Sequence, residues 1–344
     1  MPVPFVSLAG SVQGVMLRVL LALLPAIAVH AWWYGPGILI QLALASAAAL
    51  AAETLMLKLR GLPLAPFLSD LSALVTAWLL ALCLPPIAPW WLAVVGTVFA
   101  IAVAKHLYGG LGSNLFNPAM VGYCVLILSF PAEIARWPAA AALASHPLGW
   151  TETAAYIFLG HLPAGLSLDA LTAATPLDAV KTQLAASRTL NEIFRQPGLA
   201  EASPGPAWLA LAYAAGGLIL WRQRVIAWHV PAAYLTTLAL VAGIFHAADP
   251  DRYAGPLFHL IHGAGVLGAF FILTDPVSGP TTPLGKLIFA VSAALLTYLI
   301  RVFGGYPDGV AFAVLIMNMA VPLIDAYTQP PVYGKKPPGR GGGS

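Results

Sequence analysis

Apolar runs separated by short polar turns fill most of the chain, and one longer polar stretch, residues 135–205, divides them into two groups. A helix that crosses a membrane needs about 20 mostly apolar residues. By this measure the pattern predicts ten spans, five on each side of the polar stretch. They lie at residues 15–34, 36–59, 69–86, 88–108, 116–134, 206–224, 226–247, 256–275, 283–303 and 308–328.

The composition supports an integral membrane protein. Of the 344 residues, 60% are hydrophobic and 8% are charged, and the mean hydropathy is +0.84. A soluble domain carries about 25% charged residues, so this chain has too little polar surface for a water-soluble globule. The sequence has no basic stripe outside the membrane ends, so it gives no indication of nucleic-acid binding. Cys83 and Cys124 lie inside spans without CxxC spacing, so we expect packing residues rather than a disulfide or metal site.

The distribution of Lys and Arg predicts the orientation, because cytoplasmic loops carry an excess of both. With both termini in the cytoplasm, the short loops of the opposite side hold only Arg252 and Arg301. The long loop 135–205 then faces the periplasm or the cell exterior. The cytoplasmic ends hold Arg18, Lys58, Arg60, Lys105, Arg222, Arg224, Lys286, Lys335, Lys336 and Arg340.

The two groups of spans share local features. A cationic helix end followed by Gly-Gly occurs at residues 105–110 and again at 301–305, and a proline turn follows the third span of each group, at 84–86 and 274–276. A repeat of five spans is odd-numbered, so a second copy is inserted upside down. The predicted fold is therefore two five-helix inverted repeats, with chance similarity of the loops as the alternative. The predicted divisions are 1–134 and 206–328 for the repeats, 135–205 for the loop and 329–344 for a disordered cytoplasmic tail.

Several polar residues lie within or near the predicted spans. Ionisable groups at membrane depth are functional candidates because burying them is costly. Lys105 lies near a span end, where snorkelling toward the interface explains it. His259 and His262 are three positions apart on one predicted helix face. They have no nearby carboxylate, so we expect polar packing or a hydrogen bond to a cofactor rather than a metal. Asn117 is expected to cap a helix.

In the long loop, Thr175 has the features of a helix start. A hydroxyl at the N-cap, Pro176 at the first helical position and Asp178 at the third are typical of one. Apolar residues then continue at helical spacing. Taken alone, this pattern predicts only a short helix capped by Thr175.

The residues before this threonine suggest chemistry. Asp169, Thr172, Ala174 and Thr175 stand in the spacing of the Asp-x-x-(Ser/Thr)-(Gly/Ala)-Ala-Thr flavinylation motif, which this segment resembles. In proteins with that motif, a flavin transferase uses FAD to attach FMN to the last threonine through a phosphoester. The resemblance implies attachment at Thr175, with Asp169 and Thr172 as recognition or positioning residues. Ala173 stands where Gly is commoner.

The spans carry a wider resemblance. Segments of both halves resemble the family of the Rnf electron-transport complex D subunit and the sodium-pumping NADH:quinone reductase B subunit. These segments are residues 69–80, 84–86, Lys105, 109–110, 114–119, 274–276 and 280–286. The likeness covers residues 15–328. It implies a bacterial inner-membrane subunit that relays electrons through covalent FMN on Thr175, with a second, non-covalent riboflavin as a further expectation.

The same resemblance implies partners. In the family's complex, electrons pass between reduced ferredoxin and NAD while Na⁺ or H⁺ crosses the membrane. Subunits of types A, B, C, E and G would then surround this chain, and a flavin transferase would mature it. Two other functions stay open at this point. One is a secondary transporter or channel in which Thr175 only caps a helix, and the other is a structural scaffold for partner subunits.

Overall fold

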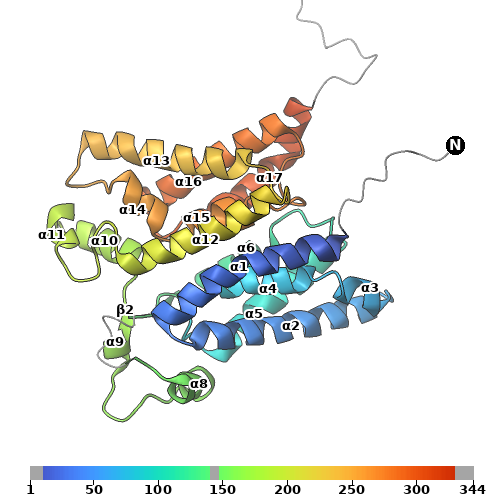
Figure 1. Ribbon diagram of the computed structural model, residues 1–344, viewed down its shortest axis with the longest axis horizontal. Coiled ribbons are helices and arrows are strands. Elements are labelled where there is room, and N and C mark those ends of the chain that lie inside the picture. The colour runs from blue at the N-terminus through green and yellow to red at the C-terminus, as the bar shows by residue number, and fades with distance from the viewer. Residues whose placement is uncertain (1–10, 140–146, 330–344) are drawn as a thin grey trace, which may run out of the picture.

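The computed structural model describes residues 11–139 and 147–329, so the tail predicted at 329–344 lies almost wholly outside the described residues. Figure 1 shows two layers of helices, one from each half of the chain, with the helices of the long loop gathered at one end. We call this end the loop end and the opposite end the far end.

The first half, residues 11–134, contains α1 (Val12–Tyr34), α2 (Gly37–Leu59), α3 (Leu64–Leu68), α4 (Ser72–Ala81), α5 (Trp90–Val98), the π-helix η1 (Phe99–His106), α6 (Pro118–Ser129) and α7 (Pro131–Ile134). The second half contains α12 (Pro204–Arg222), α13 (His229–Ala248), α14 (Pro256–Ile261), α15 (Gly265–Leu267), the π-helix η2 (Gly268–Ile272), α16 (Pro283–Phe303) and α17 (Val310–Thr328). The described part of the loop contains β1 (Trp137–Pro138), α8 (Trp150–Leu159), α9 (Leu168–Leu171), β2 (Thr172–Ala173), α10 (Pro176–Ala185) and α11 (Leu190–Phe194).

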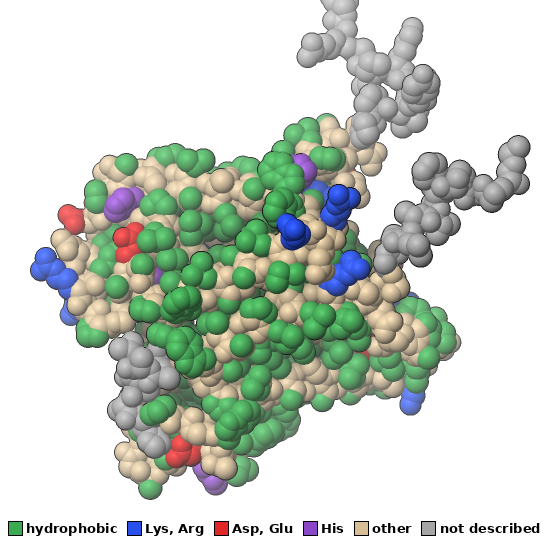
Figure 2. All heavy atoms as spheres, in the orientation of Figure 1, with side chains coloured by type: hydrophobic (Ala, Val, Ile, Leu, Met, Phe, Trp, Pro, Cys, Tyr) green, Lys and Arg blue, Asp and Glu red, His purple; other side chains and the backbone are tan. Residues whose placement is uncertain are grey.

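The helices confirm an all-α membrane protein. Within the described residues, six helical segments are long and apolar enough to cross a membrane: Val12–Tyr34, Gly37–Leu59, Leu64–Ala81, His229–Ala248, Pro283–Phe303 and Val310–Thr328. Helices Trp90–His106 and Pro118–Ser129 are apolar but shorter. Figure 2 shows hydrophobic side chains across the middle of one face, with charged side chains toward its two ends, the arrangement expected of a surface that faces lipid.

Two of the predicted spans are broken. The third was expected to begin at residue 69, but the structure has α3 before that point, α4 after it and non-helical backbone at 69–71. Leu71 has the left-handed φ of 64° there. The eighth span is interrupted between α14 and α15, where Gly263 has φ +76°. Glycine adopts that conformation without steric cost, so the second break falls among the glycines of the predicted span.

The second break also corrects one prediction. His259 and His262 were expected to share a helix face, but α14 ends at Ile261. His262 has extended backbone with φ −91° and ψ 147°. The His262 Nδ1 lies 3.0 Å from the carbonyl oxygen of Phe258, and its Nε2 lies 3.4 Å from Ser203 Oγ. The two histidines therefore do not form a pair of ligands on one helix.

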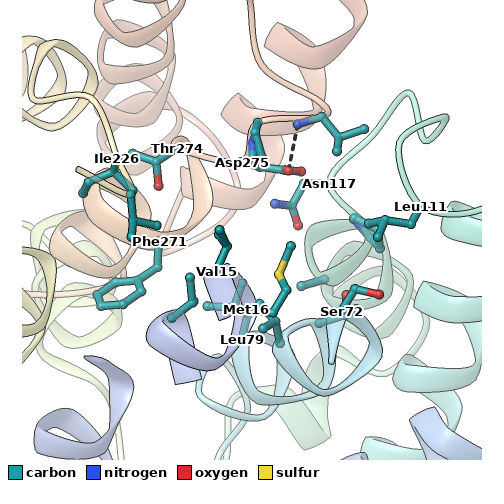
Figure 3. Close-up of a pocket in the computed structure, with 18 of the residues that line it drawn as sticks. Val15, Met16, Ser72, Leu79, Leu111, Asn117, Ile226, Phe271, Thr274 and Asp275 are labelled. Atoms are coloured by element: carbon teal, nitrogen blue, oxygen red, sulfur yellow. Dashed lines mark hydrogen bonds between the residues drawn. The ribbon is translucent and has the colours of Figure 1, made fainter. Parts of the chain in front are cut away.

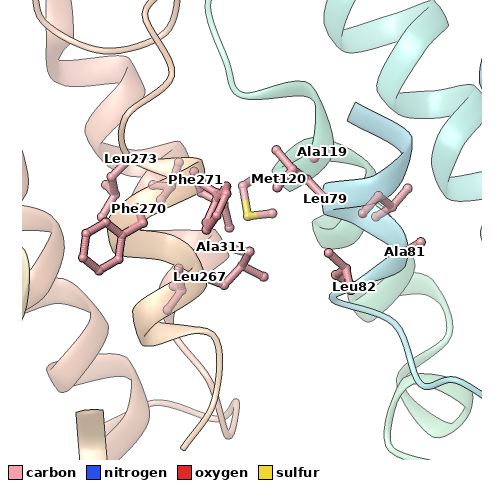
Figure 4. Packing of buried hydrophobic residues seen from close by; sticks show 14 of the residues in the cluster. Leu79, Ala81, Leu82, Ala119, Met120, Leu267, Phe270, Phe271, Leu273 and Ala311 are labelled. Atoms are coloured by element: carbon pink, nitrogen blue, oxygen red, sulfur yellow. The ribbon is translucent and has the colours of Figure 1, made fainter. Parts of the chain in front are cut away.

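The halves meet along a central seam. Helix α1 packs along α12, and α6 packs against α17. Figure 4 shows Met120 of α6 between apolar side chains from both halves. Asn117 caps α6 as predicted, because its Oδ1 accepts the Met120 backbone N–H at 3.2 Å. The Asn117 backbone N–H in turn donates to Asn318 Oδ1 at 3.0 Å, and Asn318 Nδ2 donates to the Ser278 carbonyl at 2.9 Å.

The loop helices α10 and α11 rest on the second half. A small apolar cluster joins them to the start of α14, formed by Leu177, Val180, Leu190, Ile193, Ala254 and Phe258. The Leu190 backbone N–H also donates to the Asp251 carbonyl at 2.9 Å. The segment around Thr175 is thereby fixed to the membrane-embedded helices.

The hydrogen bonds of Asn318 across the seam predict that substitutions at two neighbouring residues of α17 differ in their effect on the stability of the protein. Replacing Asn318, which is 1% exposed, with Ala leaves the Asn117 N–H and the Ser278 carbonyl without this partner. An unsatisfied buried group costs about 1–3 kcal/mol, so the apparent melting temperature in detergent should fall clearly. Met319→Ala is the matched control, because Met319 is 67% exposed. Equal melting temperatures for the two variants would contradict the role of the seam.

Candidate functional site

Thr175 forms the N-cap of α10, as the sequence predicts. Its Oγ1 accepts the backbone N–H of Asp178 at 3.3 Å, and its carbonyl oxygen accepts that of Ala179 at 2.8 Å. Pro176 occupies the first helical position. The Thr175 side chain is partly exposed, and Ala173 and Ala174 just before it are exposed. The hydroxyl therefore lies at the surface of the loop, at the positive end of a helix.

The other predicted motif residues form the turn that leads to Thr175. Asp169 lies in the exposed short helix α9. The Thr172 Oγ1 donates to the Leu168 carbonyl at 3.0 Å and closes that helix. Thr172 then pairs with Pro138 in an antiparallel contact between β2 and β1. The structure thus places Asp169, Thr172, Ala174 and Thr175 along one connected surface segment.

At the loop end, an arginine closes the break between α14 and α15. Arg301 Nε donates to Asp308 Oδ1 at 3.0 Å, and Arg301 Nη1 donates to the His259 carbonyl at 2.7 Å. Asp308 Oδ2 accepts the Ala264 backbone N–H at 2.7 Å. Polar backbone freed by the break is therefore satisfied within the protein, which the membrane interior demands.

At the far end, a lysine lies beside the break between α3 and α4. Lys105 Nζ donates to Glu53 Oε1 and Oε2 at 2.8 and 2.9 Å and to Ser72 Oγ at 2.8 Å. Asp70 Oδ1 accepts both the N–H of Ser72 at 2.7 Å and its hydroxyl at 2.6 Å. Lys105 is 2% exposed, so the prediction that it snorkels to the interface is wrong.

The buried His106 and the exposed Arg60 extend this cluster to the surface. His106 Nε2 lies 3.1 Å from Glu53 Oε2, and His106 Nδ1 lies 3.1 Å from Arg60 Nη1. A guanidinium group can only donate, so the Nδ1 of His106 accepts from Arg60, while Nε2 faces the Glu53 carboxylate. Arg60 Nη2 also donates to the Gly109 carbonyl at 2.9 Å.

Between the halves, beside the lysine cluster, lies a cavity of about 120 Å³. Figure 3 shows Val15, Met16 and Leu79 lining it from the first half and Phe271 and Asp275 from the second.

Sequence reasoning identifies Glu53 as an ionisable group at membrane depth, but it did not find the pairing of Glu53 with Lys105 or of Asp308 with Arg301. Glu53 and Lys105 are 52 positions apart, and no local pattern joins residues at that separation. Asp308 stands only seven positions after Arg301. Opposite charges on either side of the Gly-Gly at 304–305 were the available signal for that pair.

The lysine cluster predicts strong coupling between two residues. Removing one partner of a buried ion pair costs about 3–5 kcal/mol, because it leaves the other charge uncompensated. Glu53→Gln and Lys105→Met should therefore each lower the unfolding temperature strongly. The double variant should lose much less than the sum. Lys58→Met on α2 is the control, since Lys58 is exposed. Additive effects in this double-mutant cycle would argue against the pair.

Comparison with known proteins identifies the family. The model of the NQR2, RnfD, RnfE family matches residues 1–334. The chain is 49% identical over 343 residues to the D subunit of an ion-translocating oxidoreductase complex from Escherichia coli O127:H6 (strain E2348/69 / EPEC), covering 97% of both chains. Proteins of the same name from Escherichia fergusonii and Shigella dysenteriae serotype 1 are 48% and 49% identical, again over 97% of both chains. The chain therefore belongs to the NQR2, RnfD, RnfE family.

Proposed function

We propose that this chain is the D subunit of an Rnf-type ion-translocating oxidoreductase complex and relays electrons through FMN bonded to Thr175. Similarity along nearly the whole length to proteins of that name supports the first part. The observation that carries the second part is the partly exposed Thr175 hydroxyl at a helix start, directly after the motif segment 169–174.

The residues around Thr175 suit a phosphate ester. Backbone N–H groups in the first turn of a helix have no partner within the helix and attract anions. In α10 these are the N–H groups of Leu177 and Asp178, since Pro176 has none. The Asp178 N–H already donates to Thr175 Oγ1, so phosphate oxygens there replace a weak acceptor with a stronger one. The Asp178 carboxylate opposes this with its own negative charge. FMN, when attached, supplies the redox chemistry, and the chain supplies its tether and surroundings.

The proposed fold is an inverted repeat of five spans. Its support is the correspondence of the two breaks, which interrupt the third span of each half. A basic side chain contacts each break: Lys105 donates to Ser72 near the far end, and Arg301 donates to the His259 carbonyl near the loop end. Both basic residues precede a Gly-Gly turn. With ten spans, both termini are cytoplasmic and the loop is periplasmic, in the inner membrane of a bacterium. Inverted repeats commonly frame a central polar site.

Other tasks of the complex fall to partners under this proposal. Within residues 11–139 and 147–329, no group of three or more His, Cys, Asp or Glu side chains could hold a metal ion. We propose that subunits of types A, B, C, E and G supply NAD and iron–sulfur chemistry, that a flavin transferase installs the FMN, and that Na⁺ or H⁺ is the ion moved. The central cavity is the candidate place for a second, non-covalent riboflavin.

The tether predicts a clear result for three variants. Wild-type protein from cells that also express the flavin transferase should carry the mass of one esterified FMN and fluoresce on a denaturing gel. Thr175→Ala should remove both signals, and Thr175→Ser should retain part of them because it keeps the hydroxyl. Thr182→Ala is the control, since Thr182 is an exposed residue of the same helix. A wild-type mass equal to that of the bare chain would favour a transporter that uses Thr175 only as a cap.

The orientation is tested with single cysteines in a chain whose Cys83 and Cys124 are replaced by Ala. His161→Cys in the loop and Lys58→Cys at the far end both lie at exposed positions. A membrane-impermeant thiol reagent applied to spheroplasts should label His161→Cys at once and Lys58→Cys only after lysis. The reverse order of labelling would mean that the termini are outside the cytoplasm.

A further inference from the structure

We propose that Lys181 is a positioning residue that locks the helix bearing Thr175 onto the broken span of the second half. The inference rests on the proposed function for its consequence in electron transfer. The contacts that suggest it are present in the chain itself.

Lys181 reaches from the loop to the end of a membrane helix. Its Nζ donates to the backbone carbonyls of Tyr306 at 2.8 Å, Arg301 at 3.1 Å and Ile300 at 3.4 Å. The last carbonyls of a helix lack partners within the helix and carry a partial negative charge. An ammonium group has three donors, so its capacity matches these three carbonyls, two in the last turn of α16 and one in the turn that follows it.

The face of α10 that carries Lys181 also makes apolar contacts with the second half. Val180 and Lys181 lie three and four positions after Leu177, so both neighbour it on one face of the helix. Leu177 and Val180 pack into the apolar cluster that includes Phe258. Thr182 on another side is exposed. One face of α10 therefore binds the second half through apolar packing near the start and a cation lock farther along.

The lock is close to the threonine that it would position. Thr175 precedes Lys181 by six residues, which corresponds to about 9 Å along a helix axis at about 1.5 Å per residue. The intervening helix is rigid on that scale. Any tilt of α10 about its apolar contacts would thus move the Thr175 oxygen, and Lys181 is the residue that resists such a tilt.

The carbonyls that Lys181 binds belong to the segment that also closes the break. The side chains of Arg301 and Asp308 hold the broken backbone through the His259 carbonyl and the Ala264 N–H. At Gly263 the packing is tight, because a Cβ atom there would lie 2.6 Å from Leu177 Cδ1 and 2.5 Å from Asp308 Oδ2. The loop helix, the break and the end of α16 are consequently one connected unit.

Keeping the Lys181 side chain charged costs free energy, because partial burial removes some of its hydration. Partial burial lowers the pKa of Lys181, and the nearby Asp178 partly opposes that shift. A surface lysine at the solvent side of α10 would avoid this desolvation. The three carbonyl contacts offset it, which is expected of a contact with a structural task.

The test compares Lys181→Met, which keeps the apolar stem without the charge, with Lys181→Arg, which keeps the donors. Arg188→Met is the control, because Arg188 is an exposed cation just beyond α10. All are measured in the complete complex with covalent FMN. Lys181→Met should keep full FMN occupancy by intact mass, yet show lower fluorescence anisotropy of the bound FMN. Its electron-transfer rate should fall by about tenfold, as a modest misplacement of a reacting group does. Lys181→Arg should recover most of both signals.

Two results separate this inference from the proposed function. If Lys181→Met carries full FMN with wild-type anisotropy and rate, the lock has no positioning role. If the wild type carries no FMN, the proposed function fails. Hydrogen exchange of the amides of residues 176–185 then decides the lock by itself. Exchange should be faster in Lys181→Met than in Arg188→Met, and equal exchange would overturn the inference.

Discussion

Backbone that leaves the helical path inside a membrane must find hydrogen-bond partners within the protein, because lipid offers none. This chain meets the demand at both breaks with polar side chains of its own. Arg301 binds the His259 carbonyl directly, while Asp308 takes the freed Ala264 N–H. At the break before α4, Asp70 accepts the backbone N–H and the hydroxyl of Ser72, and Lys105 donates to the same hydroxyl oxygen. Each of the two cations has a carboxylate partner, Glu53 for Lys105 and Asp308 for Arg301.

The contacts at the loop end also fix the position of α10, the helix that Thr175 caps. The end of α16 supplies Arg301 to the break through its side chain and backbone carbonyls to Lys181. The helix α10 is thus held by the same few residues that satisfy the broken span. Polar satisfaction of the broken span and the position of Thr175 in the loop are consequences of one set of contacts. A helix anchored only by its apolar cluster would lack the directional contact that fixes its tilt.

Helix positions could be predicted from the sequence because spans depend on runs of apolar residues, and the cap at Thr175 because capping is local. The break near Gly263 also had a local signal in its glycines. The break at 69–71 had none, since Leu71 adopts a left-handed conformation that leucine rarely takes. Lys105 was misread for a related reason. Its partner Glu53 comes from another helix, and single-sequence patterns do not show contacts between distant segments.

The cap geometry of Thr175 fits both a plain helix start and a tethered cofactor, so the hydrogen bond alone does not separate them. A purely structural cap gains from burial, because shielding from water strengthens its hydrogen bond. Here the threonine is partly exposed and follows two exposed alanines. The exposed approach, rather than the cap itself, is the feature that favours a modification at this oxygen.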